Sequence, residues 1–132
     1  MYTPYIANIL DPKFRDSLSH SFDIITSNPP YISLDEYRQL PRSVKDYEDP
    51  RALLGDLPNI PGKDGLTFYR AIARLVVQGV LNEDDHAMVV LEVGDKQAAA
   101  VRSILMTEGR LSRTDIWLDP WGKERVVVGR RK

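Results

Sequence analysis

The chain has 132 residues, a formal net charge of −1 at pH 7 and no cysteine. This length allows one buried core, and the lack of cysteine excludes disulfides, thiolate metal sites and a cysteine nucleophile. A net charge near zero argues against strong electrostatic binding of nucleic acid, and we interpret the basic residues Arg125 and Arg130–Lys132 as a solvated tail.

Targeting and metal signals are weak in the sequence. No apolar run reaches the length of a membrane span, and residues 1–10 lack the basic residues of a signal or transit peptide. We therefore expect no membrane association and no metal site. Mitochondrial and cytoplasmic locations both stay open.

The first segments lead to one clear strand. Tyr5–Leu10 is compatible with a short strand that Asp11-Pro12 ends, and residues 13–21 form a short helix or turn. The run Phe22–Thr26 is rich in β-branched residues and bounded by polar ones, so it predicts a buried strand.

Asn28–Tyr31, with the sequence Asn-Pro-Pro-Tyr, follows this strand. Proline lacks an N–H and restricts the residue before it to extended geometry, so the strand ends here. Asn28 then lies at the carboxyl end of a strand, where open α/β sheets bind ligands. A proline-terminated strand followed by a turn is the alternative interpretation.

This segment suits the chemistry of an amide or amine. The side-chain carbonyl of Asn28 and the backbone carbonyl of Pro29 can accept both hydrogens of a planar –NH₂ group, and Tyr31 can cover its face. Such acceptors localise the conjugated lone pair and align it with an electrophilic methyl group. No general base is needed before transfer, because the proton can leave afterwards.

A helix and a long loop come next. Ser33 and Glu36 have the spacing of a capping box, which predicts a helix that Pro41 ends. Residues 42–64 show little periodicity and are rich in Pro, Gly and Asp. Loops this long are usually functional or disordered, so we interpret this one as a substrate-facing flap, with a mobile insertion as the alternative.

The second half alternates helices and strands. A long amphipathic helix follows Asp64-Gly65, and its apolar positions recur at helical spacing: Leu66, Tyr69, Ile72, Ala73, Val76 and Val80. Ala87–Val93 is continuously apolar, which is typical of a strand covered on both faces. Lys96–Glu108 predicts a second helix that Gly109 ends.

The chain closes with a predicted hairpin. Thr114–Leu118 and Glu124–Gly129 are two strands joined by the turn Asp119–Gly122, so we expect them to be antiparallel. We expect Asp119 and Arg125 to form a structural pair there. The order of elements predicts an α/β fold that is half of a wound sheet with an antiparallel edge.

These residues resemble one family, the HemK/PrmC-type protein glutamine N5-methyltransferases, which are class I, S-adenosylmethionine-dependent enzymes that modify release factors. The matching residues are Phe22–Ile25, Asn28–Ile32, Tyr47–Leu53, Asp64–Leu66, Tyr69-Arg70, Leu91–Gly94, Gln97, Asp119, Gly122 and Arg125–Arg130. The resemblance implies a Rossmann-like class I methyltransferase sheet with an antiparallel C-terminal edge hairpin. Residues 1–132 are then one partial domain, the substrate-side half.

The resemblance also implies roles for single residues. Asn28 and the carbonyl of Pro29 would hold the glutamine amide of a release factor's Gly-Gly-Gln loop, Pro30 would shape the segment, and Tyr31 would pack against the reacting amide or the methyl group. Asn28, Pro29 and Tyr31 are thus the catalytic candidates.

Further roles concern the flap and the cofactor. Glu48 and Arg51 would lie near the substrate, with a local ion pair on a solvated loop as the alternative. Asn8 stands where the family often has an acidic residue near the adenine, so Asn8 and Asn28 are the candidates for contact with S-adenosylmethionine.

The chain departs from the family pattern on the cofactor side. Before Asp23 it has neither the Gly-rich loop nor the acidic residue that hold the cofactor in this family. We therefore expect weak or no cofactor binding, together with marginal stability or self-association. The stretch Glu48-Asp49-Pro50 looks more like eukaryotic mitochondrial members.

Two alternatives to a glutamine methyltransferase remain. A non-catalytic remnant would fold only with a partner or a second copy of itself. A nucleic-acid adenine amino-methyltransferase would share Asn28–Tyr31 but is disfavoured by the near-neutral charge.

Overall fold

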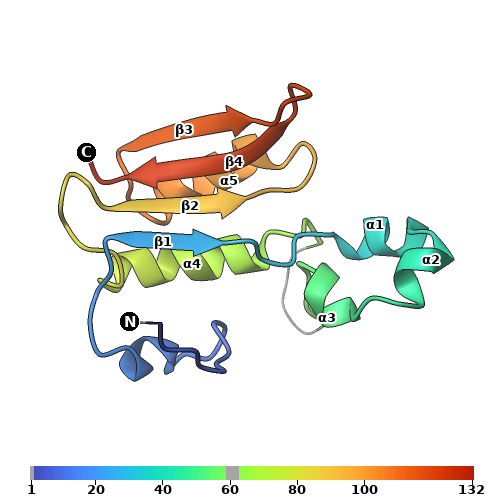
Figure 1. Cartoon of the computed structure of the whole chain (residues 1–132), viewed down its shortest axis with the longest axis horizontal. Coiled ribbons are helices and arrows are strands. Elements are labelled where there is room, and N and C mark those ends of the chain that lie inside the picture. The colour runs from blue at the N-terminus through green and yellow to red at the C-terminus, as the bar shows by residue number, and fades with distance from the viewer. Residues whose placement is uncertain (1, 59–62) are drawn as a thin grey trace.

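A four-stranded sheet carries the candidate site in the computed structural model, which describes residues 2–58 and 63–132. Its strands run in the order β1-β2-β4-β3 (Figure 1), with these bounds: β1 Ile24–Ser27, β2 Met88–Glu92, β3 Arg113–Leu118 and β4 Glu124–Arg130. β1 and β2 are parallel, whereas β4 is antiparallel to both of its neighbours. The predicted α/β class and the antiparallel edge hairpin are therefore confirmed.

Two helices pack on one face of this sheet. They are α4 (Thr67–Val77) and α5 (Ala98–Thr107), and both lie behind the strands in Figure 1. The core between the layers contains the fully buried side chains of Tyr69, Val76, Val89, Leu91 and Val101. The predicted amphipathic helix is thus present, and its apolar stripe faces the sheet.

The prediction that Ala87–Val93 is covered on both faces is wrong for the described chain. Val89 and Leu91 are fully buried beneath the helices, but Val90, which points to the opposite face, is only half-buried. Because α4 and α5 share one face (Figure 1), they leave the other face of β2 open.

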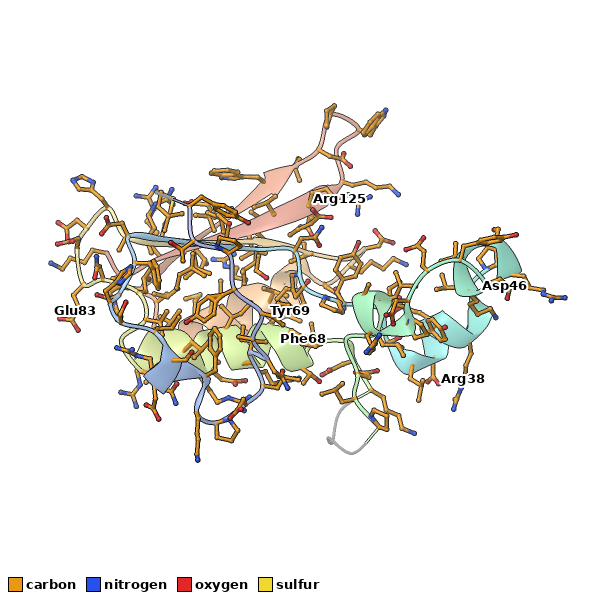
Figure 2. All side chains as sticks on the ribbon, turned by 60° about the horizontal axis from the view of Figure 1, so that its bottom comes forward. Arg38, Asp46, Phe68, Tyr69, Glu83 and Arg125 are labelled. Atoms are coloured by element: carbon orange, nitrogen blue, oxygen red, sulfur yellow. The ribbon has the colours of Figure 1, made fainter. Side chains whose placement is uncertain are left out.

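Three short helices project beyond the carboxyl ends of β1 and β2 (Figure 1), and the first of them precedes the flap predicted for residues 42–64. From here on, the flap means residues 33–58. The helices are α1 (Leu34–Gln39), α2 (Arg42–Lys45) and α3 (Pro50–Leu53). The capping box of Ser33 and Glu36 is present as predicted. Arg38 and Asp46 mark the outer part of the flap, away from the sheet, in Figure 2.

The interpretation of residues 42–64 as a loop without regular structure is wrong where α2 and α3 form. The carboxylate of Asp49 caps α3 by accepting from the N–H of Arg51, and Pro50 takes the first helical position, where proline is favoured. Residues 59–62 of the predicted loop lie outside the described residues.

The expected strand at Tyr5–Leu10 is not formed. The backbone carbonyl and side chain of Asn8 accept hydrogen bonds from the N–H groups of Asp11 and Leu10, which makes a turn instead of a ladder. Ile9 packs against the core next to α4, and a single 3-10 turn, η1 (Phe14–Ser17), leads on to β1. The outer edge of β1 therefore has no strand beside it among the described residues.

Neither a membrane-spanning helix nor a metal-binding cluster is found in residues 2–58 and 63–132. None of the helices there has both the length and the apolar character that a membrane crossing requires. In the same part of the chain, no group of three or more His, Asp or Glu side chains is arranged to hold a metal ion.

Candidate functional site

A cavity of about 200 Å³ lies where β1 ends. Five consecutive residues, Asn28–Ile32, form one wall, and Ala52 and Leu53 of α3 form the other. The segment that sequence reasoning singled out thus lines a cavity together with the flap. The short helix that places Ala52 and Leu53 was missed, although the Asp49-Pro50 pair is a cap signal for it.

Two hydrogen-bond acceptors stand free in this wall. Within the described residues, neither the side chain of Asn28 nor the carbonyl of Pro29 has a hydrogen-bond donor. Asn28 is exposed, so its side-chain oxygen is on an accessible residue. Pro29 is buried, so its carbonyl oxygen is on a residue held by its surroundings. Because the φ angles of Pro29 and Pro30 are fixed by their rings, the backbone that carries these acceptors is stiff.

The flap is bonded to this segment through its backbone. The N–H of Ile32 donates to the carbonyl of Leu53 at 3.0 Å, and the N–H of Gly55 donates to the carbonyl of Ile32 at 2.9 Å. These two bonds form an isolated parallel bridge between the site segment and the end of α3. The wall made by α3 is therefore fixed to the residue that follows Tyr31.

Two polar side chains, those of Asp56 and Tyr69, form hydrogen bonds to the backbone around the site. Asp56, which is 5% exposed, accepts the N–H of Leu34 and the N–H of Gly65, each at 2.8 Å. Tyr69 projects from α4 toward the sheet (Figure 2) and its hydroxyl donates to the carbonyl of Glu92 at 2.8 Å. Burial raises the pKa of Tyr69, so this hydroxyl keeps its proton and its hydrogen bond.

Two glycines allow the backbone of the site to pack closely. A Cβ atom at Gly94 would lie 2.7 Å from the ring of Tyr31, and one at Gly65 would collide with the carbonyl oxygen of Tyr31. Gly65 also has a φ of 71°, a left-handed conformation that glycine adopts without strain. Both glycines are therefore needed for Tyr31 to lie where it does.

The flap residues Glu48 and Arg51 are not part of the cavity lining. Both are exposed, and Arg51 forms its ion pair with Asp49, at 2.7 Å, instead of with Glu48. The hydrogen bonds from Arg51 lower the pKa of Asp49 to about 2. The structure thus favours a local ion pair as the role of Arg51, with Asp49 as its partner in place of Glu48.

Asn8 and Asn28 are not brought together. Asn8 lines a different cavity, of about 340 Å³, with Arg51, Leu54 and Phe68 among its other walls. Its side-chain oxygen already accepts the N–H of Leu10, and the residue is exposed. Asn8 stands on a turn and not at the end of a strand, so its expected position beside the cofactor is not formed.

The described residues do not fit S-adenosylmethionine. No strand followed by a Gly-rich turn precedes β1 within residues 2–58, and no acidic side chain lines the cavity at Asn28. The space beside Gly65 and Gly94 is occupied by the backbone and ring of Tyr31, so these two glycines do not form a ligand-binding turn. The described residues therefore present a cavity with two acceptors but no cofactor cradle.

The expected pair of Asp119 and Arg125 is confirmed at the β3–β4 hairpin, where Figure 2 labels Arg125. Asp119 accepts from Arg125 at 3.3 Å and from the N–H groups of Trp121 and Lys123 at 2.9 Å each. These hydrogen bonds lower the pKa of Asp119 and order the turn. The pair is structural, as expected.

No family model matches the chain. The chain is 37% identical over 112 residues, 85% of its length, to the release factor glutamine methyltransferase of Lactococcus lactis. It is 33% identical over 123 residues to the enzyme of that name from Bacillus subtilis, and 43% identical over 91 residues to that from Clostridium acetobutylicum.

These alignments cover 38%, 39% and 29% of the three relatives, so the chain spans about two fifths of their length or less. All three relatives are bacterial, and the expected likeness to mitochondrial members gains no support from them.

Proposed function

Since the chain belongs to the release factor glutamine methyltransferase family, we propose that it supplies the glutamine-binding side of methyl transfer from S-adenosylmethionine to a release factor. The glutamine is that of a Gly-Gly-Gln loop. The fold, in this proposal, is the part of a Rossmann-like class I methyltransferase sheet that follows its cofactor-binding strands.

One observation carries this proposal: two free acceptors, on Asn28 and Pro29, stand in a cavity at the carboxyl end of β1. A primary amide presents two N–H donors in one plane, so two neighbouring acceptors suit it better than they suit a carboxylate or a hydroxyl. A carboxylate would place negative oxygens against both carbonyls. The site therefore selects glutamine over glutamate.

The same two acceptors prepare the amide for transfer. Hydrogen bonds that hold both N–H groups draw electron density onto the nitrogen, and the stiff frame fixes the direction of its lone pair. Tyr31, half-buried and backed by Gly94, covers one side of the cavity and excludes water from the amide. Ala52 and Leu53 give the apolar wall against which a glycine-rich loop can pack.

Glu48 and Arg51 have a smaller role in this proposal than the resemblance implies. They are exposed on the flap and can meet residues of the release factor outside the cavity, but neither touches the amide site. The amino-methyltransferase alternative gains no support, because the cavity offers one half-buried aromatic ring and no basic side chain.

Binding of a release factor, with transfer of a labelled methyl group followed in the same reaction, tests the proposed function. The chain is incubated with S-adenosylmethionine labelled in the methyl group and a release factor, with DNA and RNA in parallel reactions. Because the described residues form no cofactor cradle, we expect this chain to bind the release factor without transferring label. Binding should be lost when the Gly-Gly-Gln glutamine is replaced by glutamate, and it should be about tenfold weaker in Asn28→Ala.

Two results would contradict the proposal. Label in DNA or RNA would assign the site to nucleic-acid amines. No label in any acceptor, with no binding of the release factor, would make the chain a non-catalytic remnant.

A further inference from the structure

Gln97 bonds to three separate segments of backbone at the candidate site. Its side-chain oxygen accepts the N–H of Gly94 at 3.1 Å. Its side-chain nitrogen donates to the carbonyl of Tyr31 at 2.9 Å and to the carbonyl of Asp64 at 3.2 Å. The side-chain amide of Gln97 therefore joins three segments: the residue after β2, the site segment and the turn before α4.

The local backbone directs Gln97 away from its own helix. Gln97 is the N-cap residue of α5, yet its side chain makes no capping bond to that helix. Lys96, just before it, has a φ of 61°, a left-handed conformation that is unfavourable for a residue with a Cβ atom. Such strain persists where surrounding contacts hold it, and here it turns the amide of Gln97 toward Tyr31.

The segment held by Gln97 is stiff, so a shift at Tyr31 reaches the acceptors. Pro29 and Pro30 come directly before Tyr31 and have fixed φ angles. A displaced Tyr31 carbonyl can be absorbed only by the ψ angle of Pro30 and the two backbone angles of Tyr31, so part of the shift passes to the Pro29 carbonyl. Gly94 lies against the ring of Tyr31 and limits its position from the other side.

We propose that Gln97 is a positioning residue, which fixes the Asn28–Tyr31 segment so that its two acceptors are pre-arranged for the glutamine amide. The inference rests on the proposed function, and it adds a residue that does not touch the substrate. Gln97 does not line the cavity, so its effect on amide binding passes through Tyr31.

The substitution Gln97→Glu tests this role with almost no change of shape. Glutamate keeps the oxygen that accepts from Gly94, but it replaces the donating nitrogen by a second oxygen that faces the carbonyls of Tyr31 and Asp64. The probe is a blocked Gly-Gly-Gln peptide, whose affinity for the whole chain is measured by NMR titration. Thermal unfolding and hydrogen exchange of the Ile32 amide are measured in parallel.

We expect Gln97→Glu to fold, to bind the peptide about tenfold more weakly at pH 7, and to exchange the Ile32 amide faster. We also expect the affinity to recover as the pH approaches about 4.3, because a protonated carboxyl group can again donate to the Tyr31 carbonyl. The matched control is Gln78→Glu, the same chemical change at an exposed residue that follows α4. It should leave peptide affinity and Ile32 exchange unchanged.

The outcomes separate this inference from the proposed function. A lower unfolding temperature with unchanged peptide affinity would show a purely structural role and overturn the inference. If the unsubstituted chain binds no peptide, the proposed function fails. The Ile32 exchange then decides on positioning alone: faster exchange in Gln97→Glu at an unchanged unfolding temperature supports it, and unchanged exchange or a general loss of stability overturns it.

Discussion

At the residue scale, the site depends on how closely single backbone atoms approach one another. Gly94 illustrates this, since a methyl group there would lie 2.7 Å from both the ring of Tyr31 and the side-chain oxygen of Gln97. Real Cβ atoms do not occupy such positions, so one of the two neighbours has to move. The free acceptors of Asn28 and Pro29 are thus maintained by residues that never touch them.

We expect Gly94→Ala to lower the free energy of unfolding by about 1–3 kcal/mol, the usual cost of overpacking a buried position. It should also weaken peptide binding, because Tyr31 is displaced. Gly79→Ala is the control: with a φ of 80° and no atom within 4 Å, it should cost only about 1–2 kcal/mol of backbone strain and leave binding unchanged. Equal peptide affinity in both variants would refute the packing argument.

Asp64, at the turn before α4, makes a pH-dependent contribution to the free energy of unfolding. Arg70, 2.9 Å away, holds the pKa of Asp64 below its ordinary value. A carboxyl group with a depressed pKa stabilises the fold fully above its unfolded pKa, and this contribution is lost as the pH falls through the folded pKa. Because the two side chains are 42% and 35% exposed, the contribution is less than about 1 kcal/mol.

We therefore expect Asp64→Asn to be slightly less stable than the unsubstituted chain at pH 7, with the difference shrinking as the pH falls below the ordinary aspartate pKa of about 3.9. Urea unfolding at a series of pH values measures this. Asp35→Asn, in the more exposed pair with Arg38, serves as the comparison and should change stability less. A difference that grows as the pH falls would contradict the sign of the linkage.

At the scale of elements, the flap is tied to the core by the buried carboxylate of Asp56. It accepts one N–H at the start of α1 and another at Gly65, so it connects the flap to the turn that leads into α4. The backbone bridge between Ile32 and Leu54 is the second tie. Both ties are close to the cavity, so the wall formed by α3 depends on them.

Asp56→Ala should destabilise the chain by about 1–3 kcal/mol, because it leaves two N–H groups without an acceptor. We expect faster proteolytic cleavage within residues 42–58, while α4 and β2 stay protected. Asp46→Ala removes an exposed flap carboxylate that pairs with Arg42, and it should change neither the stability nor the rate of cleavage. Equal cleavage of the two variants would show that Asp56 does not hold the flap.

Element predictions from the sequence succeeded where one local signal was strong. The Ser33–Glu36 capping box, the stripe on α4 and the short turn after Leu118 each specify their structure through neighbours in the chain. Prediction failed at Tyr5–Leu10, because a strand needs a partner edge and the turn at Asn8 satisfies the backbone first. It also failed at α3, because one turn of helix has no periodicity to detect.

At the scale of the whole molecule, the chain is a sheet with helices on one face only (Figure 1). On the open face, Ile24 is 56% exposed and Trp117 is 49% exposed, and no described strand pairs with the outer edge of β1. Unpaired strand edges and uncovered apolar side chains favour association.

We expect the chain to self-associate with increasing concentration, as measured by sedimentation velocity. Ile24→Lys should shift it toward the monomer, because a charge on an exposed edge strand opposes pairing. Val77→Lys is the control: it also replaces an exposed β-branched residue by lysine, but at a 43% exposed position on α4. A chain that stays monomeric at every concentration would contradict this expectation.

The candidate site was predicted from the sequence only in its central segment. Asn28–Tyr31 could be placed at the end of a strand because the prolines act locally. The rest of the site comes from residues far away in the sequence, and no local pattern reports contacts of this kind. These residues are Ala52, Leu53, Asp56 and Gln97. Asn8 was assigned by analogy to a strand that does not form here.

The most direct test of amide binding is an NMR titration of the isotope-labelled chain with a blocked Gly-Gly-Gln peptide and, separately, with a blocked Gly-Gly-Glu peptide. The proposed site predicts saturable shifts at Asn28, Tyr31, Ile32, Ala52 and Leu53 with the glutamine peptide alone, and their loss in Asn28→Ala. Equal shifts with both peptides, or shifts confined to other residues, would contradict the assignment of this cavity to a glutamine amide.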